Sequence, residues 1–285
     1  MSAAGRLRWR KFVNVVMLGG TGVCAAAIAS VLLFILGYLL VNGASSLNLA
    51  FFTELPKPVG ESGGGMANAI VGSAKILGLA VVFGVPLGFQ GGVYLAEYAG
   101  SATAFVLRYV VDLLNGVPSI VIGIFAYSLV VLRAKHFSAF AGGVALGLMM
   151  IPIAVRSTEE FLRTVPRGLR EAALALGAPK WKVLATVVVP AARDGIMTGI
   201  MLNLARVAGE TAPLLFTAFS NRFWSSGLDQ PTASLPVMVY TYAISPYEDW
   251  HRQAWAAGFV LLMLVLLMNV AARALLARSP MRRSR

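Results

Sequence analysis

Long apolar segments constrain this chain more than any other feature of its sequence. A helix needs about 20 mostly apolar residues to cross the hydrocarbon core of a bilayer. Segments that approach or exceed this length lie at Val16–Val41, Met66–Tyr94, Val117–Leu132, Phe140–Val155, Gly195–Phe219 and Ala254–Leu275. Only 13% of the residues are charged, whereas soluble domains average about 25%. Because so few charges cannot cover a water-soluble surface, we expect an all-α integral membrane protein with about six transmembrane helices.

The segment before the first span carries four basic residues, Arg6, Arg8, Arg10 and Lys11. A cleaved signal peptide also begins with basic residues, but its apolar region is only about 7–15 residues long. We therefore interpret Val16–Val41 as an anchor that is not cleaved. The chain then divides into three parts. Residues 1–65 hold the basic segment, the first span and an outer loop, 66–275 hold a five-helix core with a long connection at 156–194, and 276–285 form a basic tail.

The distribution of basic residues predicts the orientation of the spans. The chain contains 24 Lys and Arg residues, and most of them lie in the N-terminal segment, the 156–194 connection and the tail. Cytoplasmic loops carry an excess of these residues. We therefore expect a multi-pass protein of the bacterial inner membrane with both termini in the cytoplasm. The formal net charge of +12 fits this pattern, and no basic motif interleaved with aromatic residues indicates nucleic-acid binding.

The sequence motifs of common catalytic sites are absent. The chain has no Gly-x-x-x-x-Gly-Lys-Ser/Thr phosphate loop and no His-Glu-x-x-His zinc motif. Its single cysteine, Cys24, lies in an apolar span and excludes an intrachain disulfide. We therefore expect a transport subunit that has no catalytic site, cofactor or metal of its own.

The 156–194 connection is expected to present two short helices to the cytoplasm. Pro166 precedes the first helix, and Gly177 provides its end. Apolar side chains recur in this helix at intervals of three and four residues, at Leu169, Ala172, Ala173 and Leu176. The second helix is predicted over Lys180–Val189 and is expected to stop at Pro190.

This connection also carries a known motif. Its residues are Glu171, Ala172, Ala173, Gly177, Val187, Val189 and Pro190. The spacing resembles the EAA loop of importer-type ABC permeases, in which the two valine positions hold Ile and Leu. The resemblance implies a coupling helix, with Glu171, Ala172, Ala173 and Gly177 as its motif residues, that docks on a cytoplasmic ATPase. ATP and Mg would be bound by that partner. The alternative is an ordinary amphipathic cytoplasmic loop.

The predicted fifth span contains three polar residues on one side. Asn203, Arg206 and Glu210 fall at intervals of three and four residues, which places them on a shared helix face. A charge at a span centre costs about 2.5–3.5 kcal/mol on insertion scales, so such side chains face a bundle interior or a water-filled pathway. One interpretation is a substrate pathway in which Arg206 attracts an anion and Glu210 orients Arg206, because a guanidinium fork matches tetrahedral oxyanions. The alternative is an intrahelical ion pair that fixes helix packing.

Further segments at 114–123, 206–213 and 242–246 resemble the corresponding stretches of PstA-type phosphate permeases. The resemblance implies a MetI-like ABC importer permease fold with a cytoplasmic coupling helix. It also implies three partners: a homologous second permease (PstC-like), a dimeric ATPase (PstB-like) and a periplasmic phosphate-binding protein (PstS-like). The expected function is translocation of inorganic phosphate across the inner membrane.

Two other functions fit parts of this pattern. A permease for another oxyanion, such as molybdate, sulfate or phosphonate, would share the fold, because one arginine does not select among tetrahedral anions. A stand-alone secondary transporter would work without an ATPase and would show inverted repeats, and the EAA loop has no purpose there.

Small and polar residues within the spans predict details of their packing. Glycines recur at four-residue spacing, at Gly84, Gly88 and Gly92 and again at Gly143 and Gly147, which indicates close contact between helices. Lys75 lies within the second span, and extension of its side chain to the outer surface would explain it without any function. The alternative is a role in attracting anions at the outer mouth. Pro118 is expected to kink the third span.

Overall fold

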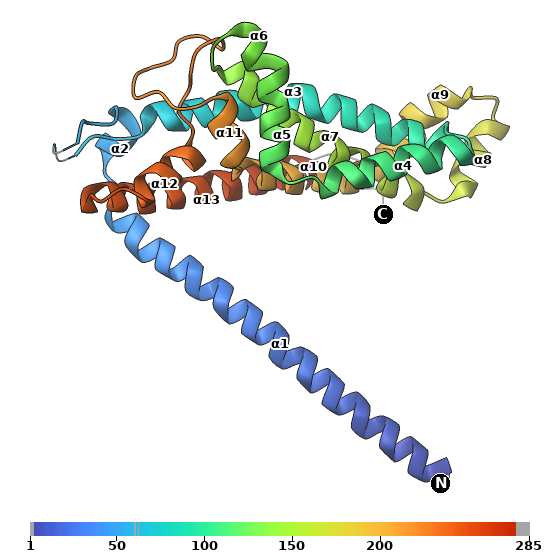
Figure 1. Ribbon diagram of the computed structural model, residues 1–285. Coiled ribbons are helices and arrows are strands. Elements are labelled where there is room, and N and C mark those ends of the chain that lie inside the picture. Colours follow the sequence, from blue (N-terminus) through green and yellow to red (C-terminus); the bar gives the residue numbers. More distant parts are fainter. Residues whose placement is uncertain (1–2, 60, 62, 278–285) are drawn as a thin grey trace.

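The computed structural model describes residues 3–59, 61 and 63–277, and its regular elements in these ranges are all helices (Figure 1). They are α1 (Ala3–Ser45), α2 (Leu49–Thr53), α3 (Ala67–Glu97), α4 (Ser101–Gly116), α5 (Ser119–Ala126), the π-helical segment η1 (Tyr127–Val131), α6 (Leu132–Ala134), α7 (Ala139–Thr164), α8 (Arg167–Ala175), α9 (Lys180–Val183), the π-helical segment η2 (Leu184–Val188), α10 (Val189–Ala208), α11 (Ala212–Thr217), α12 (Leu235–Ala243) and α13 (Glu248–Ala277). Residues 278–285, most of the predicted basic tail, lie outside the described residues.

Five continuous helical stretches are long and apolar enough to cross a membrane. They are Gly5–Ser45, Ala67–Glu97, Ala139–Thr164, Lys180–Ala208 and Glu248–Ala271. A sixth crossing results if the helices Ser101–Gly116 and Ser119–Ala134, which meet at 100°, are taken as one bent span. The predicted all-α membrane architecture with about six spans is confirmed.

The bend in the third span lies at Pro118, as predicted. Proline lacks a backbone N–H, and its ring disfavours helical backbone angles at the residue before it. Val117 accordingly adopts extended backbone angles, with φ −70° and ψ 129°. Beyond the bend α5 packs on α11 and α7. Gly123 allows this approach, because a Cβ atom there would lie only 2.6 Å from the Cα atom of Pro213.

The fifth span begins earlier than predicted. We expected a short helix, Lys180–Val189, to stop at Pro190, but one helix runs continuously over Lys180–Ala208. The π-helical segment η2 ends at Val188, two residues before Pro190, and the N–H of Val189 donates to the carbonyl of Leu184, five residues back. This wider turn shifts the backbone hydrogen-bond pattern just before Pro190, which has no N–H to donate. The helix therefore continues past the proline without a break. The predicted boundaries Gly195–Phe219 are wrong at both ends.

The bundle is organised by close contact between α3 and α7, which run side by side (Figure 1). Gly84, Gly88 and Gly92 are buried on the contacting side of α3. A Cβ atom on Gly88 would lie 2.4 Å from the Cβ atom of Ala154, and one on Gly92 would lie 2.5 Å from the Cβ atom of Thr158. Real Cβ atoms do not approach this closely, so the glycines set the separation of the two helices. The contact predicted from the glycine spacing is confirmed.

We predict that Gly88→Leu separates α3 from α7 and destabilises the protein. Forcing side-chain atoms into a packed contact costs about 1–3 kcal/mol, and more when backbone must move. The measurement is the yield of folded protein and its thermal unfolding midpoint in detergent. Gly78→Leu is the matched control on the same helix, because a Cβ atom at Gly78 meets nothing within 4 Å. Equal midpoints for the two variants would contradict this account of the contact.

The segment between α11 and α12 folds back over the ends of α3 and α7 (Figure 1). The side chain of Asn68 donates to the carbonyl of Asn221 at 2.7 Å, and the N–H of Phe140 donates to the carbonyl of Leu228 at 2.9 Å. The ammonium group of Lys75 donates to the carbonyl of Ser225 in the same segment. Lys75 therefore leaves the span by bonding to loop backbone, which agrees with the extended side chain predicted for it.

Helix α1 stands away from the bundle and meets it only at its C-terminal end (Figure 1). There Tyr38 contacts Trp255 of α13 edge-on, with ring centroids 5.2 Å apart. Gly43 allows a close crossing, because a Cβ atom on it would lie 2.6 Å from the Cβ atom of Phe259. None of the most apolar window of α1 is buried within the chain. Such a helix requires lipid or another protein along nearly its whole length.

Candidate functional site

The three polar residues predicted for a substrate pathway lie near the end of α10, but they do not share one helix face. Helix α10 ends at Ala208, and the N–H of Glu210 donates to the carbonyl of Val207 at 3.1 Å in the turn that follows. Glu210 is therefore outside the helix that carries Arg206. Pro213, in the first turn of α11, helps to explain the break, because it has no N–H to donate to the carbonyl of Gly209 four residues back.

Arg206 lies on the exposed surface of this chain, and Glu210 is half-buried. The salt bridges found among the described residues do not include a pair between them. The intrahelical ion pair that we considered as an alternative is therefore not formed. Arg206 is in the last turn of α10, where the partial negative charge of the helix end favours a cation. At membrane depth an exposed guanidinium must face water, lipid headgroups or a second protein.

Asn203 is placed differently from Arg206. Its side chain is buried, and its Nδ2 atom donates to the backbone carbonyl of Met150 in α7 at 2.9 Å. This contact joins α10 to α7 in the centre of the bundle. The polar stripe predicted from residue spacing is thus divided between a helix–helix contact and an exposed surface. The roles predicted for these residues in the substrate pathway stay predictions.

The helix predicted at the EAA motif is confirmed as α8. It begins at Arg167 directly after Pro166, and Gly177 follows its end with a left-handed backbone, φ +81°. The N–H of Gly177 donates to the carbonyl of Leu174 at 2.9 Å. Glycine is favoured at this position because a side chain there would be strained.

The expected apolar face of α8 is largely uncovered. Ala173 packs against the cluster formed by the ends of α7 and α10, whereas Leu169 is 48% exposed and Leu176 is 89% exposed. Ala172 and Glu171 are exposed as well. Exposed leucines and an exposed carboxylate on one short helix form a surface suited to docking against another protein.

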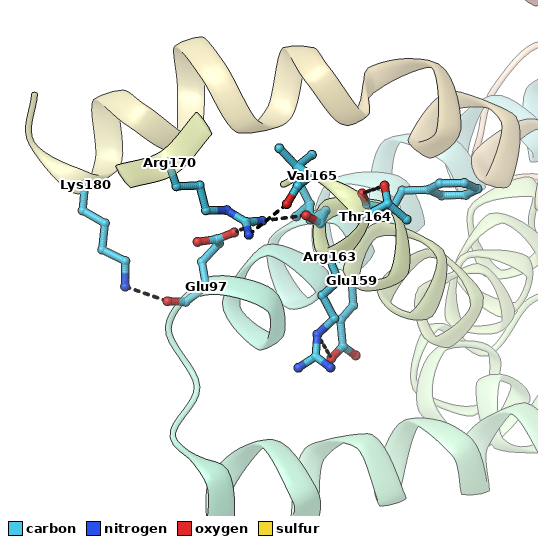
Figure 2. A network of polar contacts seen from close by, with 9 residues as sticks. Glu97, Glu159, Arg163, Thr164, Val165, Arg170 and Lys180 are labelled. Carbon is cyan, nitrogen blue, oxygen red and sulfur yellow. Dashed lines mark hydrogen bonds and ion pairs between the residues drawn. The ribbon is translucent and has the colours of Figure 1, made fainter. Parts of the chain in front are cut away.

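A network of charged groups ties α8 to the ends of two spans (Figure 2). Arg170 of α8 forms an ion pair with Glu97, the last residue of α3, at 2.9 Å. Its guanidinium also donates to the carbonyls of Leu162 at 2.6 Å and Val165 at 3.2 Å, at the end of α7. Lys180, the first residue of α9, donates to the carbonyl of Glu97 at 2.7 Å. The ends of three spans and α8 therefore meet at one place.

A second group of charges surrounds Glu159 of α7. This carboxylate is buried, accepts a hydrogen bond from Arg108 of α4 at 2.7 Å and forms an ion pair with Arg163 at 3.2 Å. A cavity of about 340 Å³ lies beside it, lined by Arg108, Arg156, Glu159, Glu160 and Arg163. The pair with Arg108 holds α4 against α7 at the same end of the bundle as α8 (Figure 1).

Sequence reasoning missed Arg170, Glu97 and Glu159. The available signal was weak: each lies at or near the end of a span, where charged residues are common. Arg170 and Glu97 are 73 positions apart in the sequence (170 − 97), so no helical spacing relates them. Only the folded arrangement of α3, α7 and α8 brings their side chains together.

The comparisons with known proteins agree with this geometry. A family model described as "Binding-protein-dependent transport system inner membrane component" matches residues 84–280. The "Phosphate transport system permease protein PstA" of Yersinia pestis is 47% identical over 248 residues, which cover 87% of this chain and 84% of that protein. The protein of the same name from Haemophilus influenzae is 44% identical over 94% of this chain and 95% of its own length. The chain belongs to the PstA permease family. It is a multi-pass protein of the inner membrane.

Solved structures of other ABC transporters share the fold. The inward-facing MetNI methionine ABC transporter matches with a TM-score of 0.59 and 21% sequence identity, over 74% of this chain and 95% of that chain. A bacterial ABC transporter involved in the import of the polysaccharide alginate matches with a TM-score of 0.57 and 12% identity, over 75% and 79% of the two chains. The predicted MetI-like fold of this PstA family member is confirmed.

We predict that Asn203→Ala destabilises the PstA-type bundle. Loss of the amide leaves the α7–α10 contact without its hydrogen bond, which costs about 1–3 kcal/mol when a buried partner is involved. The measurement is the thermal unfolding midpoint of the purified protein in detergent. Asn269→Ala is the matched control, because the amide of Asn269 donates to the carbonyl of Val265 within its own helix. An equal decrease of the midpoint in both variants would contradict the conclusion that the Asn203 hydrogen bond stabilises the contact between α10 and α7.

Proposed function

We propose that this chain is a transmembrane permease subunit of an ABC importer that moves inorganic phosphate across the inner membrane into the cell. The observation that carries the proposal is the 44% identity to a PstA phosphate permease across 94% of the chain. An EAA segment folded as an exposed helix with a left-handed glycine at its end supports the ATP-coupled part of the proposal.

The proposed complex contains a homologous second permease, a dimeric ATPase and a periplasmic phosphate-binding protein. The ATPase binds ATP and Mg, and this chain performs no covalent chemistry. Both termini lie in the cytoplasm, so that α8 faces the ATPase and the α11–α12 segment faces the binding protein. ATP binding closes the ATPase dimer and moves α8, the spans of the two permeases rock, and hydrolysis resets the complex.

Arg206 is the proposed contact for the anion. It is exposed on this chain, and no carboxylate pairs with it among the described residues, so its charge is available to a ligand. A guanidinium presents several N–H donors in a fixed plane, which suits the oxygens of a tetrahedral anion. The exposed side of α10 would then face the second permease, with the pathway between the two subunits. Glu210 is proposed to temper the affinity of Arg206 so that phosphate is released.

We predict that Arg206→Gln lowers phosphate uptake by about ten- to hundredfold, the range expected for loss of one charged hydrogen-bonding group. Assembly of the complex should be preserved, because Arg206 makes no salt bridge with any residue that the structure describes. Uptake into proteoliposomes and co-purification of the subunits are the two measurements. Arg133→Gln is the control at another exposed arginine. Parallel loss of uptake and assembly in Arg206→Gln would instead assign Arg206 to subunit packing.

We predict that Glu171→Ala uncouples or disassembles the complex. Glu171 is exposed on α8, and the proposal places it against the ATPase. Removing its carboxylate would leave the charged group of the ATPase that faces it without a partner. Two quantities are measured: the amount of ATPase that co-purifies with this chain, and the number of ATP molecules hydrolysed per phosphate imported. Glu160→Gln removes an exposed carboxylate from the neighbouring helix and serves as the control. Normal assembly and normal coupling in Glu171→Ala would show that this motif residue does not form the contact.

The experiment that tests the whole proposal is uptake into proteoliposomes that hold this chain, the second permease and the ATPase, with binding protein outside and ATP inside. Phosphate uptake that needs both additions and that excess sulfate does not suppress is the expected result. ATP-dependent uptake of molybdate, sulfate or phosphonate in place of phosphate would leave the coupling proposal and replace the substrate. Uptake by this chain alone would identify a secondary transporter.

A further inference from the structure

Arg170 occupies an unusual place for a residue of an exposed loop helix. It directly precedes Glu171 of the EAA motif, yet its side chain points back into the bundle (Figure 2). It pairs with Glu97 at 2.9 Å, and the two side chains are only 21% and 12% exposed. Its neighbours Gly168 and Glu171 are exposed. Helix α8 therefore presents one side outward and is held from the other by the guanidinium group of Arg170 and by the packing of Ala173.

The partners of Arg170 are the ends of two spans. The carbonyls of Leu162, in the last turn of α7, and of Val165, which follows α7, lie at the helix end that carries partial negative charge. The carboxylate of Glu97 belongs to the C-terminal end of α3. One planar cation thus bonds to both helix ends at once, which a guanidinium fork can do and a lysine ammonium cannot do with the same geometry. We call Arg170, Glu97 and the two carbonyls the Arg170 clamp.

The next span is attached at the same place. Lys180 donates to the backbone carbonyl of Glu97 at 2.7 Å, and its ammonium group lies 4.6 Å from the centre of the Tyr98 ring. Lys180 begins the continuous helix that leads to Arg206. A displacement of α8 that is passed to Glu97 therefore also reaches the start of the span that carries the proposed anion contact.

The covalent connections of α8 are less suited to this task. Val165 and Pro166, on its N-terminal side, have extended or turn backbone angles rather than helical ones. On its C-terminal side the chain turns through Gly177, with φ +81°. Both connections interrupt the helix, so α8 is not a rigid extension of α7 or α9. Without the Arg170 clamp, a force applied to α8 could rotate this helix about its two connections and leave the spans in place.

We infer that Arg170, held by Glu97, is a positioning residue that passes the movement of α8 to α3, α7 and the start of the Lys180–Ala208 span. The inference rests on the proposed function, because it assumes that an ATPase moves α8. Loss of the clamp should leave ATP hydrolysis intact and reduce the amount of phosphate imported for each ATP.

The first test measures phosphate imported per ATP hydrolysed in proteoliposomes that hold the whole complex. Arg170→Gln and Glu97→Gln should each lower this ratio roughly tenfold, the scale on which one charged hydrogen-bonded contact shifts a two-state equilibrium. Arg170→Lys keeps the charge without the fork and should be intermediate. The double variant Arg170→Gln/Glu97→Gln should be no worse than either single variant, because both remove the same contact.

Arg163→Gln is the matched control for this test. Arg163 lies on the same end of α7, but it is 53% exposed and pairs with Glu159 one helical turn away. Arg108 still pairs with Glu159 when Arg163 is replaced. The variant therefore removes an arginine from the same surface without opening the Arg170 clamp, and its ratio of phosphate to ATP should equal that of the parent complex.

The second test follows the position of α8 directly. Cysteines replace Gly100, beside the end of α3, and Gly168 in α8, where a Cβ atom meets nothing within 4 Å in either case. Cys24→Ser removes the native thiol. With spin labels at both cysteines, the distance distribution in the complex should stay narrow and unchanged between the ATP-free and ATP-bound states. In Arg170→Gln the distribution should broaden or shift when ATP binds.

The outcomes separate the two levels of the argument. Failure of the parent complex to import phosphate with ATP would reject the proposed function. A second outcome is ATP-dependent import by the parent complex, while Arg170→Gln changes neither the phosphate imported per ATP nor the distance between the spin labels. This outcome would reject the role of the Arg170 clamp and leave the proposed function in place. Poor assembly of all clamp variants, with a normal ratio in the complexes that remain, would show that Arg170 only stabilises the fold and would also reject the inference.

Discussion

The close contact between α3 and α7 is the interaction on which the rest of the bundle depends. In a membrane, burial of apolar side chains between helices gains little over contact with lipid, so association depends on close packing and a few polar contacts. Gly84, Gly88 and Gly92 bring the two backbones together. Asn203 then joins α10 to α7 through a carbonyl in the same helix. The other elements pack around this pair of helices.

The same two helices end together, and this shared end is where α8 is attached. Because α3 and α7 are held at a set separation by their glycines, their last carbonyls and Glu97 form a fixed group of acceptors. Arg170 fills that group from α8. A contact within the membrane and a contact at its edge are therefore parts of one arrangement: the first sets the spacing that the second requires.

Two parts of this chain have surfaces that only other molecules can complete. Helix α1 leaves its apolar length uncovered, and α8 leaves Leu169 and Leu176 exposed beside Glu171. Arg206 adds an exposed charge on α10. An isolated chain with these surfaces would be unstable in water and incomplete in lipid. This is the form expected of one subunit in a larger membrane complex.

The sequence by itself determined the helical membrane class, the bend at Pro118, the glycine contact of α3 and the helix at the EAA motif, because each depends on local chemistry or on the strict length that a bilayer demands. It did not determine where the fifth span begins and ends. A π-helical turn before Pro190 let that helix continue, and Gly209 with Pro213 ended it before Glu210 could share a face with Arg206. Only the tertiary structure decided that Asn203 bonds to α7 and that Arg170 meets Glu97. Those partners are far apart along the chain, and the packing of whole helices, which no local pattern encodes, brings them within hydrogen-bonding distance.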